Sequence, residues 1–335
     1  MSSALVSIVM PVKNAAPFLV ECLESILAQT HTNWELLAVN DHSTDDTPTL
    51  LYEFSKRDER IHWLTNKGNG IIPALQTAYK ASSGEFITRM DADDIMTPNK
   101  LSVMTAQLHK AGVGYLATGG VHYFSEGRLG KGFERYASWL NKLTIKAENF
   151  KEMYKECVIP SPCWMVYRSD FESCGAFNAE VYPEDYDLAF RFYKHGLQVI
   201  PSDEVLHHWR DYASRTSRTD ENYADNSFIP LKCHYFLELD YKTDRTLILW
   251  GAGQRGKKVA QCLIENKVNF RWICNNQRKI GKFIYGVEME SFKQLKRLEN
   301  KQFILTMANH SEQKSIKRLF SSYKLIMGED YFFWV

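Results

Sequence analysis

The sequence lacks a long hydrophobic run and an excess of charge of either sign. Its 335 residues carry 41 Lys and Arg against 40 Asp and Glu, which gives a formal net charge of +1. A charge so near zero provides no bulk attraction to phosphates, so we expect no nucleic-acid partner. The apolar runs are far shorter than the roughly 20 residues of a membrane-spanning helix, so no membrane span is expected either.

Its seven cysteines also lack any regular spacing. They form neither CxxC pairs nor the pattern of a zinc site. The first residues, MSSALVSIVMPVKN, lack the basic segment and long apolar segment of a secretory signal. An odd, dispersed set of cysteines without an export signal indicates reduced thiols. We therefore expect a cytoplasmic protein whose cysteines are buried as small apolar side chains.

What the sequence does contain is an alternation of strand-like and helix-like segments over its first 90 residues. Residues 16–27, for example, have apolar side chains at helical spacing. This alternation predicts an α/β fold, with a parallel sheet covered by helices on both faces. The strand-like runs are VSIVMPV (6–12), ELLAVND (35–41), IHWLT (61–65) and EFITRM (85–90).

Polar residues follow three of these strands where each one ends, in PVKN, VNDHSTDDT and RMDADD. Ligands of parallel sheets bind beyond the carboxyl ends of the strands, so these segments should converge on one edge. The third contains Asp91, Asp93 and Asp94. Alternating carboxylates of this kind suit Mg²⁺ or Mn²⁺, which takes one or two of them together with phosphate oxygens. The alternative interpretation is a solvated acidic turn. Like charges this close together are unfavourable, so without a metal ion the three acids need some other positively charged partner.

A second, smaller α/β domain is predicted for residues 243–335. TLILWGAGQRGKKVAQCLIEN has the order strand, glycine loop, helix, and QFILTMANHSEQKSIKRLF repeats it. GAGQRG (251–256) fits the GxGxxG pattern of Rossmann domains. The acid that contacts the ribose of NAD is replaced at the end of the next strand by Asn275 and Asn276. A Rossmann-like domain for binding or dimerisation is therefore favoured over a dehydrogenase.

The first 240 residues resemble glycosyltransferase family 2, whose members have the GT-A fold. The matching segments are residues 6–47, ASSGEFITRMDADDIMTPNKL (81–101) and PEDYDLAFR (183–191). The resemblance implies a nucleotide-sugar-binding GT-A catalytic domain over residues 1–240, followed by the Rossmann-like domain.

The resemblance also implies roles for individual residues. Asp185 would be the general base, and Asp93 and His207 would be metal ligands for Mn²⁺ or Mg²⁺. The alternative for His207 is a structural role. The alternatives to Asp185 as the base are Glu184 and Asp187. The residues expected to bind the nucleotide-sugar are Pro11, Val12, Asn14, Asp41, Asp91, Ala92 and Asp93.

One departure from the family concerns the helix after the third strand. The usual Arg there is absent from KGNGIIPALQTAYK (67–80). Donor contacts are then expected from Gly70, where a glycine allows close approach of the backbone, and from Arg89. Candidates for acceptor or phosphate contacts are Trp164, Glu184 and Arg210, with Tyr182, Arg215 and Arg218 as further ones. The alternative for Trp164 is core packing, and the alternative for the arginines is a solvated loop.

The activity implied is an inverting, metal-dependent glycosyltransferase of the hexosyltransferase type. It would move a sugar from a nucleotide-sugar, UDP-linked, to a glycan or lipid-linked acceptor in surface polysaccharide synthesis. Peripheral association with the cytoplasmic face of the membrane and a homo-oligomer through the C-terminal domain are implied as well. Two alternatives stay open: a regulatory protein that binds nucleotide-sugars, and a sugar-phosphate nucleotidyltransferase. The latter needs a glycine-rich, basic loop after the first strand, which PVKNAAPF does not match.

Overall fold

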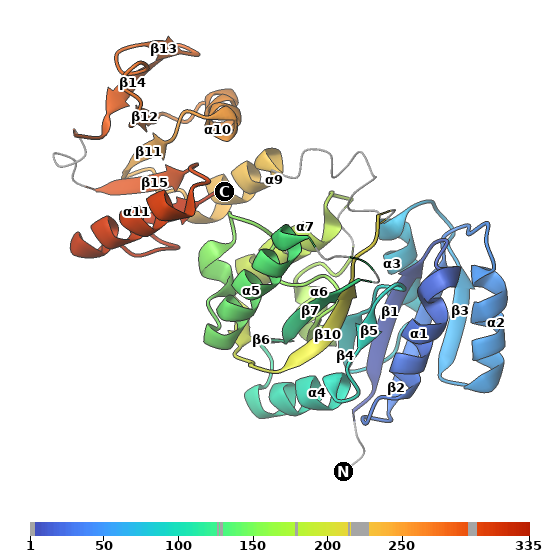
Figure 1. The fold of residues 1–335 in the computed structure, drawn as a ribbon. Coiled ribbons are helices and arrows are strands. Elements are labelled where there is room, and N and C mark those ends of the chain that lie inside the picture. Colours follow the sequence, from blue (N-terminus) through green and yellow to red (C-terminus); the bar gives the residue numbers. More distant parts are fainter. Residues whose placement is uncertain are drawn as a thin grey trace. The chain divides into compact units, whose positions relative to one another are not determined.

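The computed structural model describes residues 4–125, 127, 130–177, 180–213, 215, 228–293 and 300–335. The chain divides into two compact units. The first unit comprises Met1–Asn149 and Val158–Tyr223, and the second comprises Phe150–Cys157 and Ala224–Val335. Figure 1 shows both, with most of their elements labelled. Arg218, a predicted candidate for phosphate binding, lies outside the described residues.

The first unit is built on a seven-stranded sheet. The first four strands of the chain are parallel, and β8 runs antiparallel between β4 and β6. The three longest, β1, β2 and β3, are the predicted apolar runs, which confirms the predicted α/β class. In sheet order the strands are β3 (Ile61–Thr65), β2 (Trp34–Asn40), β1 (Val6–Val12), β4 (Phe86–Arg89), β8 (Trp164–Tyr167), β6 (Tyr115–Thr118) and β9 (Gln198–Ile200).

Helices connect and cover this sheet. Helix α1 has Pro17 in its first turn and buries Leu19, Cys22, Leu23 and Ile26 at the predicted spacing. Among the described helices, none combines the length and the apolar character needed to cross a membrane. The helices of this unit are α1 (Ala16–Leu27), α2 (Thr47–Arg57), α3 (Ile71–Ala81), α4 (Lys100–Ala111), α5 (Lys131–Lys146), α6 (Arg168–Ser173) and α7 (Glu184–Lys194).

A second, three-stranded sheet lies next to the acidic segment of the first unit. Its central strand β10 (Val205–Arg210) runs antiparallel to β5 (Ile95–Met96) and parallel to β7 (Gly120–Phe124). A side chain at Gly119 would not fit beside β10, because a Cβ there would lie 2.6 Å from the side chain of Leu206. This sheet brings residues 205–210 alongside the residues that follow β4.

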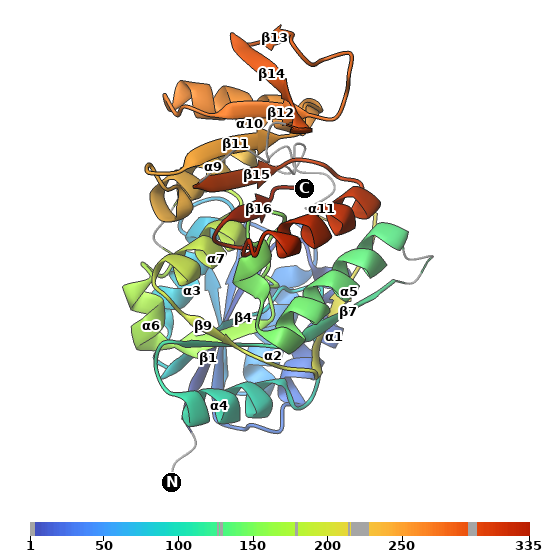
Figure 2. The same cartoon turned by 90° about the vertical axis from the view of Figure 1, so that its left-hand side faces the viewer.

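The second unit has a six-stranded sheet that is flanked by α10 and α11 (Figure 2). Gly251 has φ +124°, and a Cβ on Gly256 would lie 2.3 Å from the Gly251 carbonyl oxygen, so the turn of the GAGQRG loop requires both glycines. The elements are α9 (Ile229–Tyr235), η3 (Phe236–Asp240), β11 (Thr246–Trp250), α10 (Gln254–Glu265), β12 (Arg271–Cys274), β13 (Phe283–Ile284), β14 (Val287–Ser291), β15 (Lys301–Leu305), α11 (His310–Ser322) and β16 (Tyr331–Phe333).

The second unit also includes residues that the predicted boundary at residue 240 assigned to the first domain. Tyr154 stacks on Trp334, with ring centroids 5.5 Å apart, and contacts Phe236 edge-on. Its hydroxyl donates to Asp240 Oδ2 at 2.5 Å. The aromatic core of the second unit therefore depends on the segment 150–157, and the two units do not divide at residue 240.

All seven cysteines are free thiols. The prediction that all seven are buried as small apolar side chains is confirmed for five and wrong for Cys157 and Cys262, which are partly exposed.

Tyr154→Ala should lower the free energy of unfolding of the second unit by about 3–5 kcal/mol, the usual result of removing a buried aromatic ring. Chemical denaturation followed by tryptophan fluorescence would measure it. Tyr323→Ala is a suitable control, since Tyr323 is 47% exposed and surface substitutions change stability by about 0.5 kcal/mol or less. An unchanged denaturation midpoint for Tyr154→Ala would show that segment 150–157 is not part of this core.

Candidate functional site

The loops that follow β1, β2, β3 and β4 leave the parallel sheet at the same edge, because the four strands are parallel and adjacent (Figure 1). This edge carries Asn14, Asp41, Gly70 and the acids of residues 91–94. The predicted convergence of the polar segments is therefore present in the structure.

Asp41, directly after β2, is held by donors from two neighbouring loops, those after β1 and β3. It accepts from Asn66 Nδ2 at 2.6 Å, from the Gly70 backbone N at 3.0 Å and from Lys13 Nζ at 3.2 Å. Burial acts to raise the pKa of Asp41, but these hydrogen bonds outweigh it and the pKa is lowered. Asp41 is therefore an ionised carboxylate, only 4% exposed, that joins the loops after β1 and β3. Gly70 has φ +92°, and its backbone N–H donates to Asp41.

The loop after β1 is fixed by the loop after β2. Asn14 has φ 49°; its backbone N donates to Ser43 Oγ at 2.9 Å, and its side-chain oxygen accepts from the Thr44 N–H at 2.8 Å. The carbonyl of Val12 accepts from the Asp41 N–H at 2.7 Å. Pro11 is partly exposed at the end of β1. These residues lie at the edge, but their polar groups named here already make hydrogen bonds within the protein.

The three acids after β4 have three different partners. Asp91 Oδ1 accepts from Arg89 Nε at 2.9 Å. Asp93 Oδ2 accepts from the Tyr212 hydroxyl at 2.9 Å. Burial, followed by the charges of Asp94 and Asp91, raises the pKa of Asp93 to about 6. Asp91 and Asp93 are partly exposed, and Ala92 between them is buried.

Asp94, by contrast, is fully buried and faces the protein interior. It accepts from the Arg210 backbone N at 2.8 Å, and its Oδ2 lies 3.0 Å from His207 Nε2. Burial raises the pKa of Asp94 to about 8. Asp94 is therefore a structural residue that joins β10 to the acidic loop, and only two of the three acids are placed to meet a ligand.

The predicted role of His207 as a metal ligand does not fit this arrangement. Its side chain is completely buried, with Nε2 facing Asp94 and Nδ1 3.3 Å from Lys100 Nζ. Burial, then the nearby Lys100 ammonium, keeps the pKa of His207 well below its usual value. Both ring nitrogens are thus used inside the protein, and the structural alternative applies.

Arg210 and Trp164 are corrected in the same way. Arg210 is buried between the rings of Phe18 and Phe124 and donates from Nε to the Asp93 carbonyl at 2.8 Å. Trp164 is a core residue that stacks on Phe171. Neither side chain is placed to contact an acceptor sugar or a phosphate, because each is enclosed by protein.

Arg89, predicted to bind the donor, is only 5% exposed. Besides Asp91, it binds Glu184 Oε1 through Nη1 at 2.9 Å. Glu184, predicted as an acceptor or phosphate contact, is itself 7% exposed. Both side chains are therefore committed to each other rather than to a ligand, because their polar atoms meet inside the protein.

Three acids occupy the first turn of α7, and their surroundings differ. Glu184 pairs with Arg89, and Asp187 is 3% exposed and pairs with Arg191 Nε at 2.8 Å. Asp185 is the partly exposed one. Burial of its carboxyl, followed by the charge of Glu184, raises the pKa of Asp185 to about 7. Of these three acids, Asp185 has the surroundings that suit a base near neutral pH.

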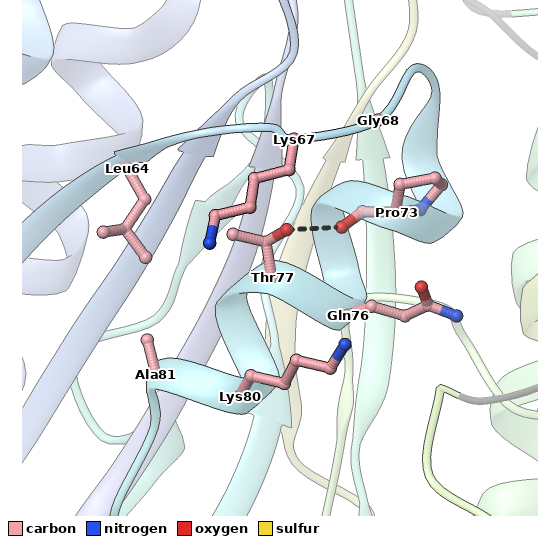
Figure 3. A pocket seen from close by; sticks show the side chains of 8 residues that line it. All are labelled: Leu64, Lys67, Gly68, Pro73, Gln76, Thr77, Lys80 and Ala81. Atoms are coloured by element: carbon pink, nitrogen blue, oxygen red, sulfur yellow. Dashed lines mark hydrogen bonds between the residues drawn. The ribbon is translucent and has the colours of Figure 1, made fainter.

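A separate hollow of about 480 Å³ lies at the end of β3 beside α3 (Figure 3). The loop of residues 66–70 contributes to both places: Gly68 lines the hollow, and Asn66 donates a hydrogen bond to Asp41. None of the predicted site residues lines it. Its lining residues are Leu64, Lys67, Gly68, Pro73, Gln76, Thr77, Lys80 and Ala81.

Several contributing residues were missed by the sequence analysis. Asn66 binds Asp41, Tyr212 binds Asp93, and Lys100 approaches His207. Asn66 follows the third strand, and that position was a usable signal. Tyr212 and Lys100 carry no such signal, because each meets its partner only after the second sheet has formed.

The acids at this edge can be compared with the ligand sets that divalent cations need. Within the described residues, no group of three or more His, Cys, Asp or Glu side chains is placed to hold a metal ion. Mg²⁺ and Mn²⁺ need only one or two carboxylates when phosphate oxygens complete the coordination. The like charges near Asp93, which raise its pKa, also favour a cation there. A cation held jointly by Asp93 and a diphosphate fits the described residues of this site.

Comparison with known proteins agrees with this geometry. The model of the family described as Glycosyl transferase family 2 matches residues 7–175. UDP-Glc:alpha-D-GlcNAc-diphosphoundecaprenol beta-1,3-glucosyltransferase WfgD of Escherichia coli is 41% identical over 117 residues, which are 35% of this chain and 46% of that protein. An uncharacterized glycosyltransferase of Rickettsia bellii (strain RML369-C) is 29% identical over 182 residues, 54% of this chain and 24% of that protein. The matches thus span less than half of these relatives' own length.

Solved structures show a similar fold. TarS 1-349 from S. aureus, in complex with UDP-GlcNAc, has a TM-score of 0.55 at 16% identity, covering 78% of this chain and 71% of that one. The mannosyltransferase PcManGT from Pyrobaculum calidifontis, in complex with GDP-Man and Mn²⁺, has a TM-score of 0.51 at 18% identity, covering 77% and 68%. These likenesses confirm the predicted GT-A fold.

Proposed function

The chain belongs to glycosyl transferase family 2, and we propose on this basis that it is an inverting glycosyltransferase that uses a UDP-sugar. The observation that carries the proposal is that the acids at the strand ends and the acids of α7 are joined through one arginine. Asp41, Asp91 and Asp93 lie at the ends of β2 and β4, and Asp185 lies at the start of α7. Arg89, between Asp91 and Glu184, connects the two groups.

The donor is assigned to the strand ends. The family resemblance assigns Asp41 to the base or ribose, and the lowered pKa of Asp41, which keeps its carboxylate ionised, supports that role. The UDP complexes of TarS and the UDP-glucose named for the E. coli relative support a uridine nucleotide. Pro11, Val12, Asn14 and Ala92 shape the edge around it.

Asp93, together with the donor diphosphate, would hold Mn²⁺ or Mg²⁺. When bound, the cation offsets the negative charge that develops on the leaving diphosphate. Asp91 contributes to the same region while it is held by Arg89. The Mn²⁺ in the PcManGT complex supports this assignment.

Asp185 is proposed as the general base. The acceptor hydroxyl attacks the anomeric carbon and gives its proton to the Asp185 carboxylate. The bond between the anomeric carbon and the β-phosphate oxygen breaks, and UDP leaves with that electron pair. Attack opposite to the leaving group inverts the anomeric configuration. The partial exposure and raised pKa of Asp185 support this role over Glu184 and Asp187.

The acceptor is proposed to be a glycan or a lipid-linked saccharide of surface polysaccharide synthesis. The lipid-linked GlcNAc diphosphate named for the E. coli relative and the chondroitin synthase of Escherichia coli, 35% identical over 106 residues, or 32% of this chain and 16% of that protein, support it. Such an acceptor would place the enzyme at the cytoplasmic face of the membrane. For the Rossmann-like residues 243–335 we propose a non-redox role, in binding or in forming a homo-oligomer, because Asn275 and Asn276 follow β12.

A nucleotide-sugar panel tests the function directly. The full-length protein is screened by thermal shift with UDP-glucose, UDP-N-acetylglucosamine and GDP-mannose, each with Mn²⁺ and with EDTA, and release of UDP or GDP is then measured. A ligand present at 100 times its Kd stabilises the folded state by about 2.7 kcal/mol. Stabilisation by a UDP-sugar with Mn²⁺, followed by UDP release, is expected. Binding without release would indicate the regulatory alternative, and synthesis of a nucleotide-sugar from its sugar phosphate would indicate a nucleotidyltransferase.

A further inference from the structure

Arg89 is the last residue of β4 and joins two segments that are far apart in the chain. Its Nη1 donates to Glu184 Oε1 and its Nε to Asp91 Oδ1, each at 2.9 Å. The side chains of Arg89 and Glu184 are 6% and 7% exposed. One buried guanidinium therefore ties the acidic loop to the first turn of α7, which carries Asp185.

Three carboxylates surround the buried Arg89 guanidinium. Asp91, Glu184 and Asp185 all lie near it, and each acts on the ionisation of the guanidinium. Glu184 Oε2 is buried, and no described residue offers it a hydrogen bond. A buried carboxylate without a cation is strongly unfavourable. Glu184 is thus paired with the Arg89 guanidinium, next to the proposed base.

An arginine is suited to this position for a geometric reason. Its guanidinium presents five N–H donors in a rigid fork and stays charged, so it binds two carboxylates at once. A lysine at the same position provides the charge from a single atom and cannot reproduce both contacts.

We propose that Arg89 is a positioning residue: it holds the first turn of α7 against the acidic loop and neutralises Glu184 beside the base. This inference rests on the proposed role of Asp185. It replaces the expectation that Arg89 binds the donor, because the side chain is buried and its donors are engaged.

The proposal has a consequence for the pH dependence of turnover. The groups that act on Asp185 are Glu184 on α7, Arg89 on β4 and Asp91 after β4. Glu184 raises the pKa of Asp185 and Arg89 lowers it. The base works when deprotonated, so the rate falls on the acid side of its pKa. Removal of Arg89 should move that acid limb to higher pH.

The test compares three variants with the best donor of the nucleotide-sugar panel. Arg89→Met should shift the acid limb of the kcat profile upward by about one to three pH units, the usual effect of losing an adjacent opposite charge. Arg89→Lys keeps the charge, so its acid limb should stay near the wild-type position while kcat falls. Arg89→Met combined with Glu184→Gln removes both charges, so its acid limb should return toward wild type.

The outcomes separate a positioning role from a merely structural one. A loss of stability alone would change the melting temperature of Arg89→Met without displacing the acid limb. If Arg89→Met is folded and has the wild-type pH profile and kcat, the proposal is overturned. It is also overturned if the double variant keeps the displaced limb of Arg89→Met. If Arg89→Met fails to fold, Arg89→Lys and the double variant are compared with wild type instead. A lower kcat of Arg89→Lys, with acid limbs near the wild-type position in both variants, supports the proposal. A wild-type kcat of Arg89→Lys overturns it.

The same assay identifies a failure of the underlying function. If Asp185→Asn is inactive while Arg89→Met has the wild-type profile, the base assignment stands and only the role of Arg89 is wrong. If Asp185→Asn keeps full turnover, the base assignment fails and the inference about Arg89 fails with it.

Discussion

Asp185→Asn is expected to lower the rate of sugar transfer by about 10²–10⁴, the range that a positioned general base contributes. The substitution keeps the volume of the side chain and most of its hydrogen bonding, but the amide cannot accept the proton of the acceptor hydroxyl. The Kd of UDP should change little, because the nucleotide is assigned to Asp41, Asp91 and Asp93. A lower kcat with an unchanged donor Kd is the pattern of a lost transition-state interaction. Steady-state kinetics and calorimetry with UDP would measure the two quantities.

The two neighbouring acids provide matched controls in the same turn of α7. Asp187→Asn loses the charge that pairs with Arg191, and Glu184→Gln loses the charge that pairs with Arg89. Both should reduce stability more than they reduce the rate. If Asp187→Asn is inactive and Asp185→Asn is not, the base lies two residues further along the helix. If all three variants retain turnover, the inverting mechanism proposed for this site is wrong.

Asp93→Ala is expected to abolish the increase in UDP affinity that Mn²⁺ causes and to lower turnover by about 10²-fold or more, since a metal ion stabilises a leaving diphosphate by several kcal/mol. Calorimetric titration of UDP with Mn²⁺ and with EDTA would measure the metal-dependent part. Because the pKa of Asp93 is raised to about 6, Mn²⁺ competes with a proton there. The wild-type metal effect should therefore grow as the pH rises from 5 to 7.

Tyr212→Phe is the matched control for this prediction. It removes the hydroxyl that donates to Asp93 Oδ2 and keeps the carboxylate and the ring that packs on Phe18. The metal-dependent affinity should fall by less than about tenfold, as expected for one hydrogen bond. An Asp93→Ala protein with the wild-type response to Mn²⁺ would mean that the cation, if used, is held elsewhere.

The sequence predicted the parts of this protein that depend on local pattern. The apolar runs that form β1, β2 and β3 are buried on the sheet, and their polar ends meet at one edge as expected. The positions of Asp41, Asp91, Asp93 and Asp185 on that edge and on α7 also follow from segment order and from resemblance to the family. In each case the information lies within a few neighbouring residues.

The expectations that the geometry does not favour concern residues that meet a distant partner. From the sequence, Arg89 is expected to contact the donor, yet it meets Glu184, which lies 95 residues further along the chain. His207 looked like a metal ligand, but Asp94 and Lys100 enclose it. Residue type indicates the chemistry a side chain offers; it does not reveal which charge will lie beside it after folding. The boundary at residue 240 failed for the same reason, because Tyr154 packs on Trp334.

The different partners of the acids in RMDADD limit how this motif could be transferred to another protein. A designer who grafts the four residues DADD onto a foreign sheet would carry over Asp94 without the β10 backbone and His207 that hold it. The graft would then bury an uncompensated carboxylate and open the loop it was meant to supply. The transferable element is larger: it includes the strand that returns more than 110 residues later. For redesign, Asp91 and Asp93 are the residues with proposed roles in donor and cation binding, whereas Asp94 has a structural role.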